Sequence, residues 1–436
     1  MKQVSTLKYL TAACLGASLL APSAYALDKN FKLNGFMRVG TIQTNAESDL
    51  ADFNSEGGKN YPNVDSLTTV GLQATYNMSP KDDFIVQVVG RGLERFDTEL
   101  EWAYVTHKIT NKWTASAGRM RTPFFMLSES QEVGFSYPTV YLPNEMYRLF
   151  ATTANGVRTS YKFTIGDWLS DIRAGLFELD NKKGQYGSTL GFNVYNGRSL
   201  SLTLSKDDWT FYLSTTGGRI NVDVQNTMNT TSCITLDGLA QLDCIFEHNG
   251  AYSSSFGHDT RTSYNDLGIT WDPGNWYLLG EVGQLNFGGG FLDDKVSGYL
   301  LLGYHVGKWL PYAIFSKGYT QSEGDQRRHD ALLALGTFAK GLGAGPLLTN
   351  DPPVCPATTS ATSGVGTLDV AISRVCNYQQ EQTTYGVGVR YDINPRLAAK
   401  AEISYATDLN GTYGTFYYPL NRDNATIVAL SLDGVF

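Results

Sequence analysis

The chain has 436 residues and a formal net charge of −8, and an acidic balance of this kind argues against nucleic acid as a partner. No segment holds the ~20 consecutive apolar residues that a membrane-spanning helix needs. The 45 glycines and 26 tyrosines, beside only 14 prolines, fit a chain of many twisted strands. A periplasmic all-β protein would share this composition, so the order of turns along the chain must decide the class.

The first residues have the features of an export signal. Two lysines lie within the first eight residues, residues 9–20 form an apolar run, and residues 24–26 are an A-x-A cleavage motif. We therefore expect a cleaved signal peptide at residues 1–26 and a single domain at residues 27–436. Loss of the two lysines takes the formal net charge to −10. A lipoprotein signal at Cys14 is the alternative, but too few apolar residues precede this cysteine.

Seven short polar segments recur along the chain. Each is rich in turn-forming residues and is flanked by runs in which polar and apolar residues alternate, as between paired strands. They are residues 79–83, 110–112, 166–167, 206–208, 272–275, 306–308 and 392–396. Seven short turns on one side predict sixteen strands with both termini on that side, and single-chain bacterial barrels have an even strand number. Residues 183–205 could form one bulged strand or an extra hairpin, so fourteen and eighteen strands remain alternatives.

The connections on the other side are mostly longer. Weakly periodic stretches rich in Gly, Asn, Ser or Pro suit loops above a barrel better than linkers between domains. The long ones are residues 45–64, 119–150, 221–260 and 321–382, and the short ones are residues 92–97 and 288–295.

The final strand gives the two faces of the predicted barrel. Val428 and Leu430 alternate with Ala429 and Ser431, and the chain ends at Phe436. A side-chain period of two places these sets on opposite faces, one suited to lipid and one to water. A soluble edge strand could alternate in the same way, but together with the export signal the pattern predicts a transmembrane antiparallel β-barrel. The same parity turns these charged residues inward: Arg38, Arg91, Arg158, Lys162, Arg173, Arg390, Lys400, Glu99, Glu101 and Glu402.

Four cysteines lie in two of the predicted loops. An even number of cysteines in an exported protein predicts disulfides, and three pairings are possible. We expect the local pairing, Cys233 with Cys244 and Cys355 with Cys376, because it requires no contact between loops. A metal site is the alternative, but no CxxC motif accompanies these cysteines. Mass spectrometry of non-reduced peptides should find these two pairs, and a different pairing would contradict the prediction.

The connection at residues 119–150 combines charged and aromatic side chains. Its acids include Glu129, Glu132 and Glu145, and its aromatic residues include Phe125 and Tyr137. So many aromatic side chains would be costly to leave bare on an exposed loop. We expect this long third loop to fold into the lumen, with its aromatic side chains packed on the wall.

The whole chain after the leader resembles the Gram-negative general porins, in its leader, sixteen-strand pattern, third-loop insertion and terminal Phe436. In that family acids of the third loop face basic residues of the wall at the narrowest point of the pore. The resemblance implies a constriction in which Glu129, Glu132 and Glu145 are the acidic side. It implies that Arg38 and Arg91 are the basic side. The PEFG motif of the family's third loop is absent.

The resemblance also implies function and partners. These are passive diffusion of small hydrophilic solutes through the outer membrane, contact with outer-membrane lipid and lipopolysaccharide, and a homotrimer. The alternative is a substrate-selective channel for phosphate, sugars or organic anions. An enzyme is not expected, because the sequence shows no nucleophile-elbow motif and none of the five histidines has an acid partner at a meaningful spacing. No cofactor is expected either. A TonB-dependent transporter is excluded by the lack of a plug domain before the strand at residues 31–44.

Overall fold

The computed structural model describes residues 29–46, 51–52, 55–56, 61–148, 153–181, 191–223, 259–288, 294–321, 380–410, 412, 414–416 and 420–436. Within these ranges, no helix is long and apolar enough to cross a membrane. The same ranges contain no group of three or more His, Cys, Asp or Glu side chains that could hold a metal ion. The predicted signal peptide and the four loop cysteines lie outside the described residues, so both remain predictions.

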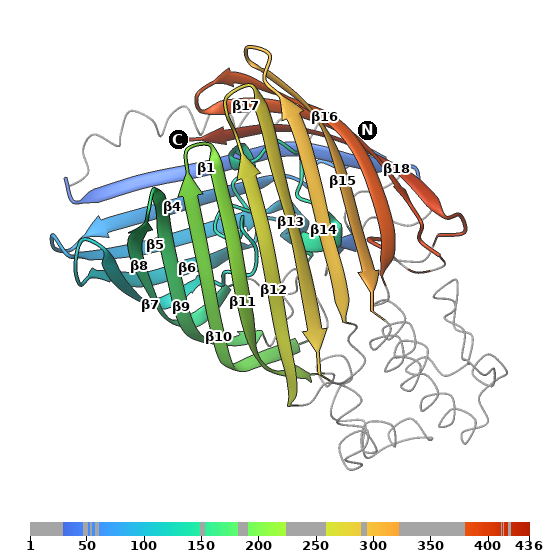
Figure 1. The fold of residues 1–436 in the computed structure, drawn as a ribbon. Coiled ribbons are helices and arrows are strands. Elements are labelled where there is room, and N and C mark those ends of the chain that lie inside the picture. The colour runs from blue at the N-terminus through green and yellow to red at the C-terminus, as the bar shows by residue number, and fades with distance from the viewer. Residues whose placement is uncertain are drawn as a thin grey trace, which may run out of the picture.

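In the described part of the chain, sixteen strands form one closed barrel, in which neighbouring strands are antiparallel (Figure 1). They are β1 (Phe31–Thr44), β4 (Thr69–Asn77), β5 (Asp82–Arg91), β6 (Thr98–Lys108), β7 (Trp113–Arg121), β8 (Thr153–Ile165), β9 (Trp168–Asn181), β10 (Gly191–Lys206), β11 (Trp209–Asp223), β12 (Thr260–Trp271), β13 (Trp276–Phe287), β14 (Lys295–Tyr304), β15 (Trp309–Thr320), β16 (Glu381–Asn394), β17 (Leu397–Thr407) and β18 (Asn424–Val435). The ring closes because β1 pairs with both β4 and β18. The prediction of an all-β barrel with sixteen strands is confirmed.

The remaining elements are small and lie in the connections. They are the hairpin of β2 (Ala51–Asp52) and β3 (Ser55–Glu56), the 3-10 turns η2 (Gly92–Glu94) and η3 (Gly134–Ser136), and the one-turn helix α2 (Asn144–Tyr147). Both η3 and α2 belong to the connection between β7 and β8.

All seven predicted turns join consecutive strands of the barrel. Four of them contain a residue with positive φ, namely Gly166, Asp207, Gly274 and Gly307. Glycine and aspartate tolerate this left-handed backbone better than most residues, which is why they mark tight turns in the sequence.

Two strands bear on expectations from the sequence, one by deciding between alternatives and one by correcting a boundary. The bulged-strand reading is confirmed for the described part of residues 183–205: β10 is one strand whose register shifts between Tyr195 and Arg198. The predicted start of the long connection at Arg119 is wrong, because pairing with β8 continues until Arg121 faces Thr153. Arg119 and Arg121 therefore belong to β7, and the connection begins at Thr122.

The two faces of the strands differ in accessibility as alternation requires. Val428 and Leu430 on β18 are 45% and 50% exposed, whereas Ala429 between them is fully buried. Large aromatic side chains gather on the outward face at the short-turn end, where Trp209 stacks on Trp271 with ring centroids 5.3 Å apart. An outward apolar band with an aromatic belt at its edge is typical of membrane barrels.

Candidate functional site

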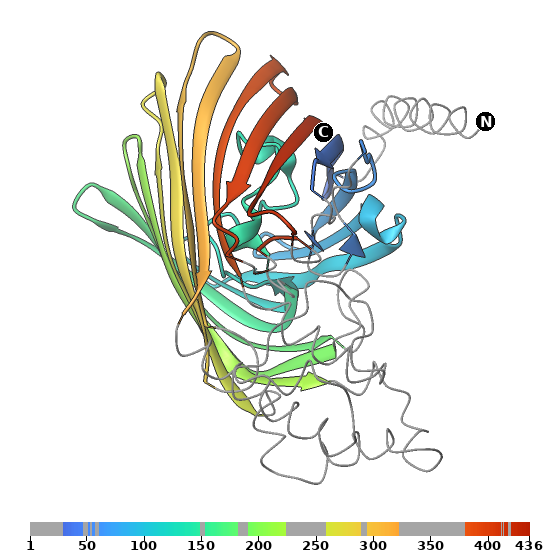
Figure 2. The ribbon, with the colours of Figure 1, turned by 90° about the vertical axis from the view of Figure 1, so that its right-hand side faces the viewer.

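The described part of the connection between β7 and β8, residues 122–148, is bonded to inward-facing side chains of many strands. We call it the β7–β8 segment. Its partners lie on β1, β5, β8, β9, β11, β13, β16 and β17. Figure 2 shows the segment, in teal, between strands of opposite sides of the ring. Four groups of contacts hold it.

The first group is built by strand register across the closure of the barrel. Arg38 on β1 faces Asp433 on β18, and Lys400 on β17 faces both Ser431 on β18 and Arg390 on β16. The Nε of Arg38 lies 2.6 Å from Oδ1 of Asp433, and the Nζ of Lys400 lies 3.3 Å from Oδ2. Asp433 is fully buried, so water does not reach its carboxylate. Arg38 and Lys400 neutralise its negative charge.

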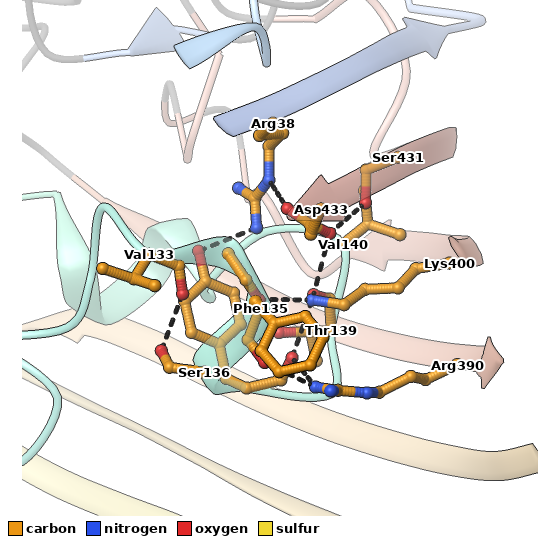
Figure 3. Close-up of polar contacts among 12 residues, drawn as sticks. Arg38, Val133, Phe135, Ser136, Thr139, Val140, Arg390, Lys400, Ser431 and Asp433 are labelled. Atoms are coloured by element: carbon orange, nitrogen blue, oxygen red, sulfur yellow. Dashed lines mark hydrogen bonds and ion pairs between the residues drawn. The ribbon is translucent and has the colours of Figure 1, made fainter. Parts of the chain in front are cut away.

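The cations of this first group donate hydrogen bonds to the β7–β8 segment, mostly to its backbone (Figure 3). Lys400 donates from Nζ to the carbonyl oxygens of Gly134, Tyr137 and Thr139, at 2.6, 2.7 and 2.9 Å. Arg38 donates to the Tyr137 hydroxyl at 3.0 Å, and Arg390 donates to the Phe135 carbonyl at 2.7 Å. Buried carbonyl groups need donors, so these cations determine the path of the segment here.

Gly134 fits this site because it has no side chain. A Cβ atom at this position would overlap the carboxylate of Asp433 and the guanidinium of Arg38. We expect Gly134→Ala to lower stability by about 1 to 3 kcal/mol, as overpacking of a tight site does. Urea unfolding in detergent micelles would measure the loss. Gly90→Ala is the control, because the nearest atom to a Cβ there is 3.6 Å away, and an equal loss in both variants would contradict the prediction.

The second group surrounds Arg91 on β5 with carboxylates. Its guanidinium lies 3.0 Å from Glu99 and 2.8 Å from Glu132, and it also contacts Glu101. A bulge in β6, where Gln87 faces Trp102 and Val88 faces Leu100, lets Glu101 turn inward. Glu99 and Glu101 belong to β6, whereas Glu132 belongs to the β7–β8 segment. Glu132 therefore joins the segment to this side of the wall.

Glu94, in the turn η2, completes the second group. The pKa of Glu94 is raised from 4.5 to about 7. Burial is the largest cause, and the nearby acids Glu99, Glu132 and Glu101 add to it, so that together they outweigh the attraction of Arg91. Such an acid holds its proton more tightly in the folded protein than in the unfolded chain. Stability from this group is therefore complete below the ordinary pKa and is lost as the pH rises to about 7.

We expect Glu94→Gln to reduce the loss of stability between pH 5 and pH 8, because glutamine carries no charge to bury. Unfolding midpoints in urea at the two pH values would measure it. The control is Glu178→Gln on β9, which replaces an exposed glutamate. A Glu94→Gln variant with the same pH dependence as the wild type would count against this assignment.

The third group lies on β8 and β9 and is the most open to water. Glu129 of the segment lies 2.8 Å from Arg158 and 3.0 Å from Arg173. Burial opposes ionisation of Glu129, but Arg173 and Arg158 together outweigh it, so its pKa lies below the ordinary value. The side chains of Glu129 and Arg173 are 46% and 31% exposed. This group can attract or repel a passing ion.

A pocket of about 240 Å³ lies beside the third group. Its charged lining residues are four bases and two acids, and hydroxyl groups and two aromatic side chains complete it. The lining residues are Arg121, Arg158, Lys162, Arg173, Glu129, Asp171, Thr106, Thr114, Ser116, Ser160, Trp102, Tyr104 and Met120. Bases therefore outnumber acids in its lining, and one of them, Arg121, also lies 3.6 Å from Glu101 and from Glu132.

The fourth group fixes the two ends of the segment by packing and hydrogen bonds. Phe125 and Met146 are each 1% exposed and belong to an apolar cluster with side chains of β12 to β15. The amide of Met126 donates to Oε2 of Glu281 at 2.8 Å. Glu145 accepts a hydrogen bond from Gln382 at 2.8 Å. Phe125 thus contributes to the site by packing.

The five residues predicted for one constriction lie in four places. Glu132 contacts Arg91, Glu129 contacts β8 and β9, Glu145 contacts β16, and Arg38 pairs with Asp433 instead of a segment acid. The side chains of Arg38 and Arg91 are only 9% and 6% exposed.

Sequence reasoning did not assign Asp433, Lys400, Arg158 and Arg173 to the site. A signal was present, because their parity already placed them on the inward faces of their strands. What the sequence lacked was the register between strands, which decides the pairs.

Comparison with known proteins shows the fold. No family model matches the chain, and no curated protein sequence does. Among solved structures, the chain is similar to OmpF of Salmonella typhi in complex with daunomycin, with 9% identity, a TM-score of 0.51 and coverage of 93% of this chain and 97% of that one.

Two other structures are similar to the same degree. Outer-membrane expressed OmpT of Vibrio cholerae has 13% identity, a TM-score of 0.50 and coverage of 93% and 97%. OprB of Pseudomonas putida has 10% identity, a TM-score of 0.50 and coverage of 94% and 96%. Together with the closed barrel of sixteen strands, these similarities show that the chain has a Gram-negative porin-type fold.

Proposed function

We propose that the protein is an outer-membrane porin, a water-filled channel for passive diffusion of small hydrophilic solutes and ions. The single observation that carries the proposal is the β7–β8 segment, which is bonded to inward charged side chains on several parts of the barrel. A segment held across a lumen narrows it, and charges at the narrowing set ion preference. The apolar outward face with its aromatic belt supports a membrane location.

Within this proposal the predicted residues divide by exposure. Glu129, with Arg158 and Arg173, borders the water path and tunes its charge. Arg38, Arg91, Glu132 and Glu145 hold the segment in place and thereby set the width of the path. The channel needs no catalytic group and no cofactor, and the proposal includes export by a signal peptide and contact with outer-membrane lipid and lipopolysaccharide. A homotrimer is proposed from resemblance to general porins alone, and chemical cross-linking of purified protein would test it.

Planar-bilayer recording of the purified protein tests the channel. We expect stepwise insertion of open channels whose current rises in proportion to salt concentration. A reversal potential measured in a salt gradient would then give the ion preference. Absence of channel activity in several lipid mixtures would overturn the proposal.

A second candidate function is selective passage of small anions such as phosphate or organic anions. The observation that favours it is the pocket beside Arg158 and Arg173, whose charged lining is mostly basic. A selective channel binds its solute, so the current would saturate or be blocked at micromolar solute. Currents that stay proportional to the concentration of each anion would exclude this alternative in favour of general diffusion.

A further inference from the structure

The pocket beside the third group combines aromatic side chains with charge. It lies on the inward faces of β6 to β9, and we call it the β6–β9 pocket. Trp102 and Tyr104 on β6 line it, with ring centroids 6.4 Å apart and ring planes inclined at 57°. Both side chains are only partly buried, so ring surface remains open to the lumen. Aromatic walls with a few placed polar groups are typical of sites for small molecules.

Glycines opposite two of the larger side chains keep the pocket open. Tyr104 faces Gly118 on β7, and Arg158 faces Gly175 on β9. Because glycine has no side chain, neither position fills the space beside the tyrosine ring and the guanidinium. The volume of about 240 Å³ is about eight times the ~30 Å³ that a water molecule occupies in the liquid. A single aromatic ring with one small substituent fits a space of this size.

The charges of the pocket leave an excess of one positive charge. Arg121 lies 3.6 Å from both Glu101 and Glu132, so its charge belongs to the second group. The other bases of the described lining are Arg158, Lys162 and Arg173, and the acids are Glu129 and Asp171. A solute with one negative charge balances three bases and two acids, whereas a phosphate group near neutral pH carries about 1.5 to 2 negative charges.

Arg158 can bind a solute carboxylate and keep its contact with the β7–β8 segment. It reaches Glu129 through Nη1, and a guanidinium has five N–H donors, so donors remain for a second carboxylate. Tyr104 lies near enough to Arg158 to interact with its charge. The hydroxyl groups of Thr106 and Ser116, 2.8 Å apart, lie in the same row across the strands as Arg158, and Tyr104 precedes this row by about 7 Å along β6. Ring surface and carboxylate donors are thus neighbours.

We propose that the β6–β9 pocket binds small aromatic monocarboxylates of the size of benzoate. The carboxylate lies at Arg158 and Lys162, and the ring packs against Trp102 and Tyr104. Two aromatic rings in offset or edge contact attract each other beyond the effect of burial, which a saturated ring of similar size does not match. The inference rests on the proposed function, because the solute reaches the pocket through the lumen, and it names one solute class for the anion-selective alternative.

The first test uses the wild-type protein and three matched solutes. Isothermal titration calorimetry of the full chain in neutral detergent micelles would compare benzoate, cyclohexanecarboxylate and benzyl alcohol, with empty micelles as the blank. Benzoate should bind about fivefold or more tighter than the saturated acid, because of the ring contacts. It should bind about tenfold or more tighter than the uncharged alcohol, because of the charged hydrogen bonds. Equal affinities for the three solutes would overturn the proposal.

Glucose and inorganic phosphate are the rival solutes in the same experiment. A neutral sugar uses the rings but not the excess charge, and phosphate uses the charge but not the rings. Both should therefore bind about tenfold or more weaker than benzoate. Phosphate that binds as tightly as benzoate would show a site for small anions in general, and glucose that does so would show a sugar site. Either result would overturn the proposal.

Trp102→Leu and Tyr104→Leu test the role of the rings. Each should abolish the preference for benzoate over cyclohexanecarboxylate, because leucine keeps apolar surface but has no aromatic ring. Two separate variants keep the test decisive where one of them folds poorly. The control is Tyr277→Leu, which removes another partly exposed tyrosine, on the inward face that β13 shares with Glu281. A preference that persists in both pocket variants, or that is lost in the control, would contradict the assignment.

Arg158→Gln and Lys162→Gln test the role of charge. Arg158→Gln should weaken benzoate and cyclohexanecarboxylate by the same factor of about ten and leave benzyl alcohol unchanged. Lys162→Gln should weaken both acids in the same sense and leaves the contact of Arg158 with Glu129 intact. The control is Lys32→Gln, an exposed base on the inward face of β1. An equal loss in the control, or no loss in either pocket variant, would show that the carboxylate lies elsewhere.

Bilayer recording separates this inference from the proposed function. Benzoate should lower the chloride current of wild-type channels until the effect saturates, and Tyr104→Leu should weaken this block by the same factor as it weakens binding. Benzoate that binds in micelles but leaves the current unchanged would contradict a pocket in the lumen. Open channels without benzoate binding would overturn this inference alone. Benzoate binding without any channel activity would overturn the proposed function and leave the binding site standing.

Discussion

Lys400→Met should detach the β7–β8 segment from the wall and raise single-channel conductance. Lys400 is 4% exposed, and its ammonium group donates to three backbone carbonyls of the segment and pairs with Asp433. Methionine fills a similar volume but donates nothing, so the three carbonyls and one side of the buried carboxylate lose their partner. Removal of one partner of a buried ion pair costs about 3 to 5 kcal/mol.

The loss of free energy of unfolding would be measured by urea unfolding in detergent micelles, and conductance in planar bilayers. The control is Lys108→Met, because Lys108 also forms an ion pair, with Asp83 at 3.1 Å, but its side chain is 46% exposed. An exposed pair of this kind contributes about 0 to 1 kcal/mol. If Lys400→Met kept both the stability and the conductance of the wild type, the segment would not depend on this contact.

Glu129→Gln should move ion preference toward anions by about twofold. The substitution removes the acidic partner of Arg158 and one of the two acidic partners of Arg173, at the most exposed charged group of the segment. A unit charge acting across ~8 Å of water contributes ~0.5 kcal/mol, which corresponds to a factor of about two in relative permeability. Folding should change little, since lumen-facing substitutions in barrels tune selectivity.

The reversal potential in a salt gradient measures this shift. The opposite change, Arg158→Gln with Arg173→Gln, should move preference toward cations. Asp208→Asn at a short exposed turn removes one acid outside the path and is the matched control. An unchanged reversal potential in both lumen variants would show that ions do not pass this group.

Most of the fold could be predicted because its signals are local. Turn-forming residues such as Gly166 and Gly274 adopt positive φ, so their positions mark the ends of strands. The alternation of Leu430 with Ala429 follows from a side-chain period of two and appears unchanged in their exposure. The predicted start of the connection at Arg119 was wrong because pairing with β8 prolongs the strand, and this pairing is not encoded in the strand's own residues.

The candidate site divides in the same way. The sequence alone determined which side chains point inward, including Arg38, Lys400 and Glu402, because parity along one strand needs no knowledge of its neighbours. Only the tertiary structure decided that Arg38 meets Asp433, 395 residues away, because barrel closure and strand register bring the two ends of the chain together. It also decided that Glu129, Glu132 and Glu145 reach three different walls. The path of a long irregular segment is set by the partners it finds across the barrel, and no local periodicity encodes those partners.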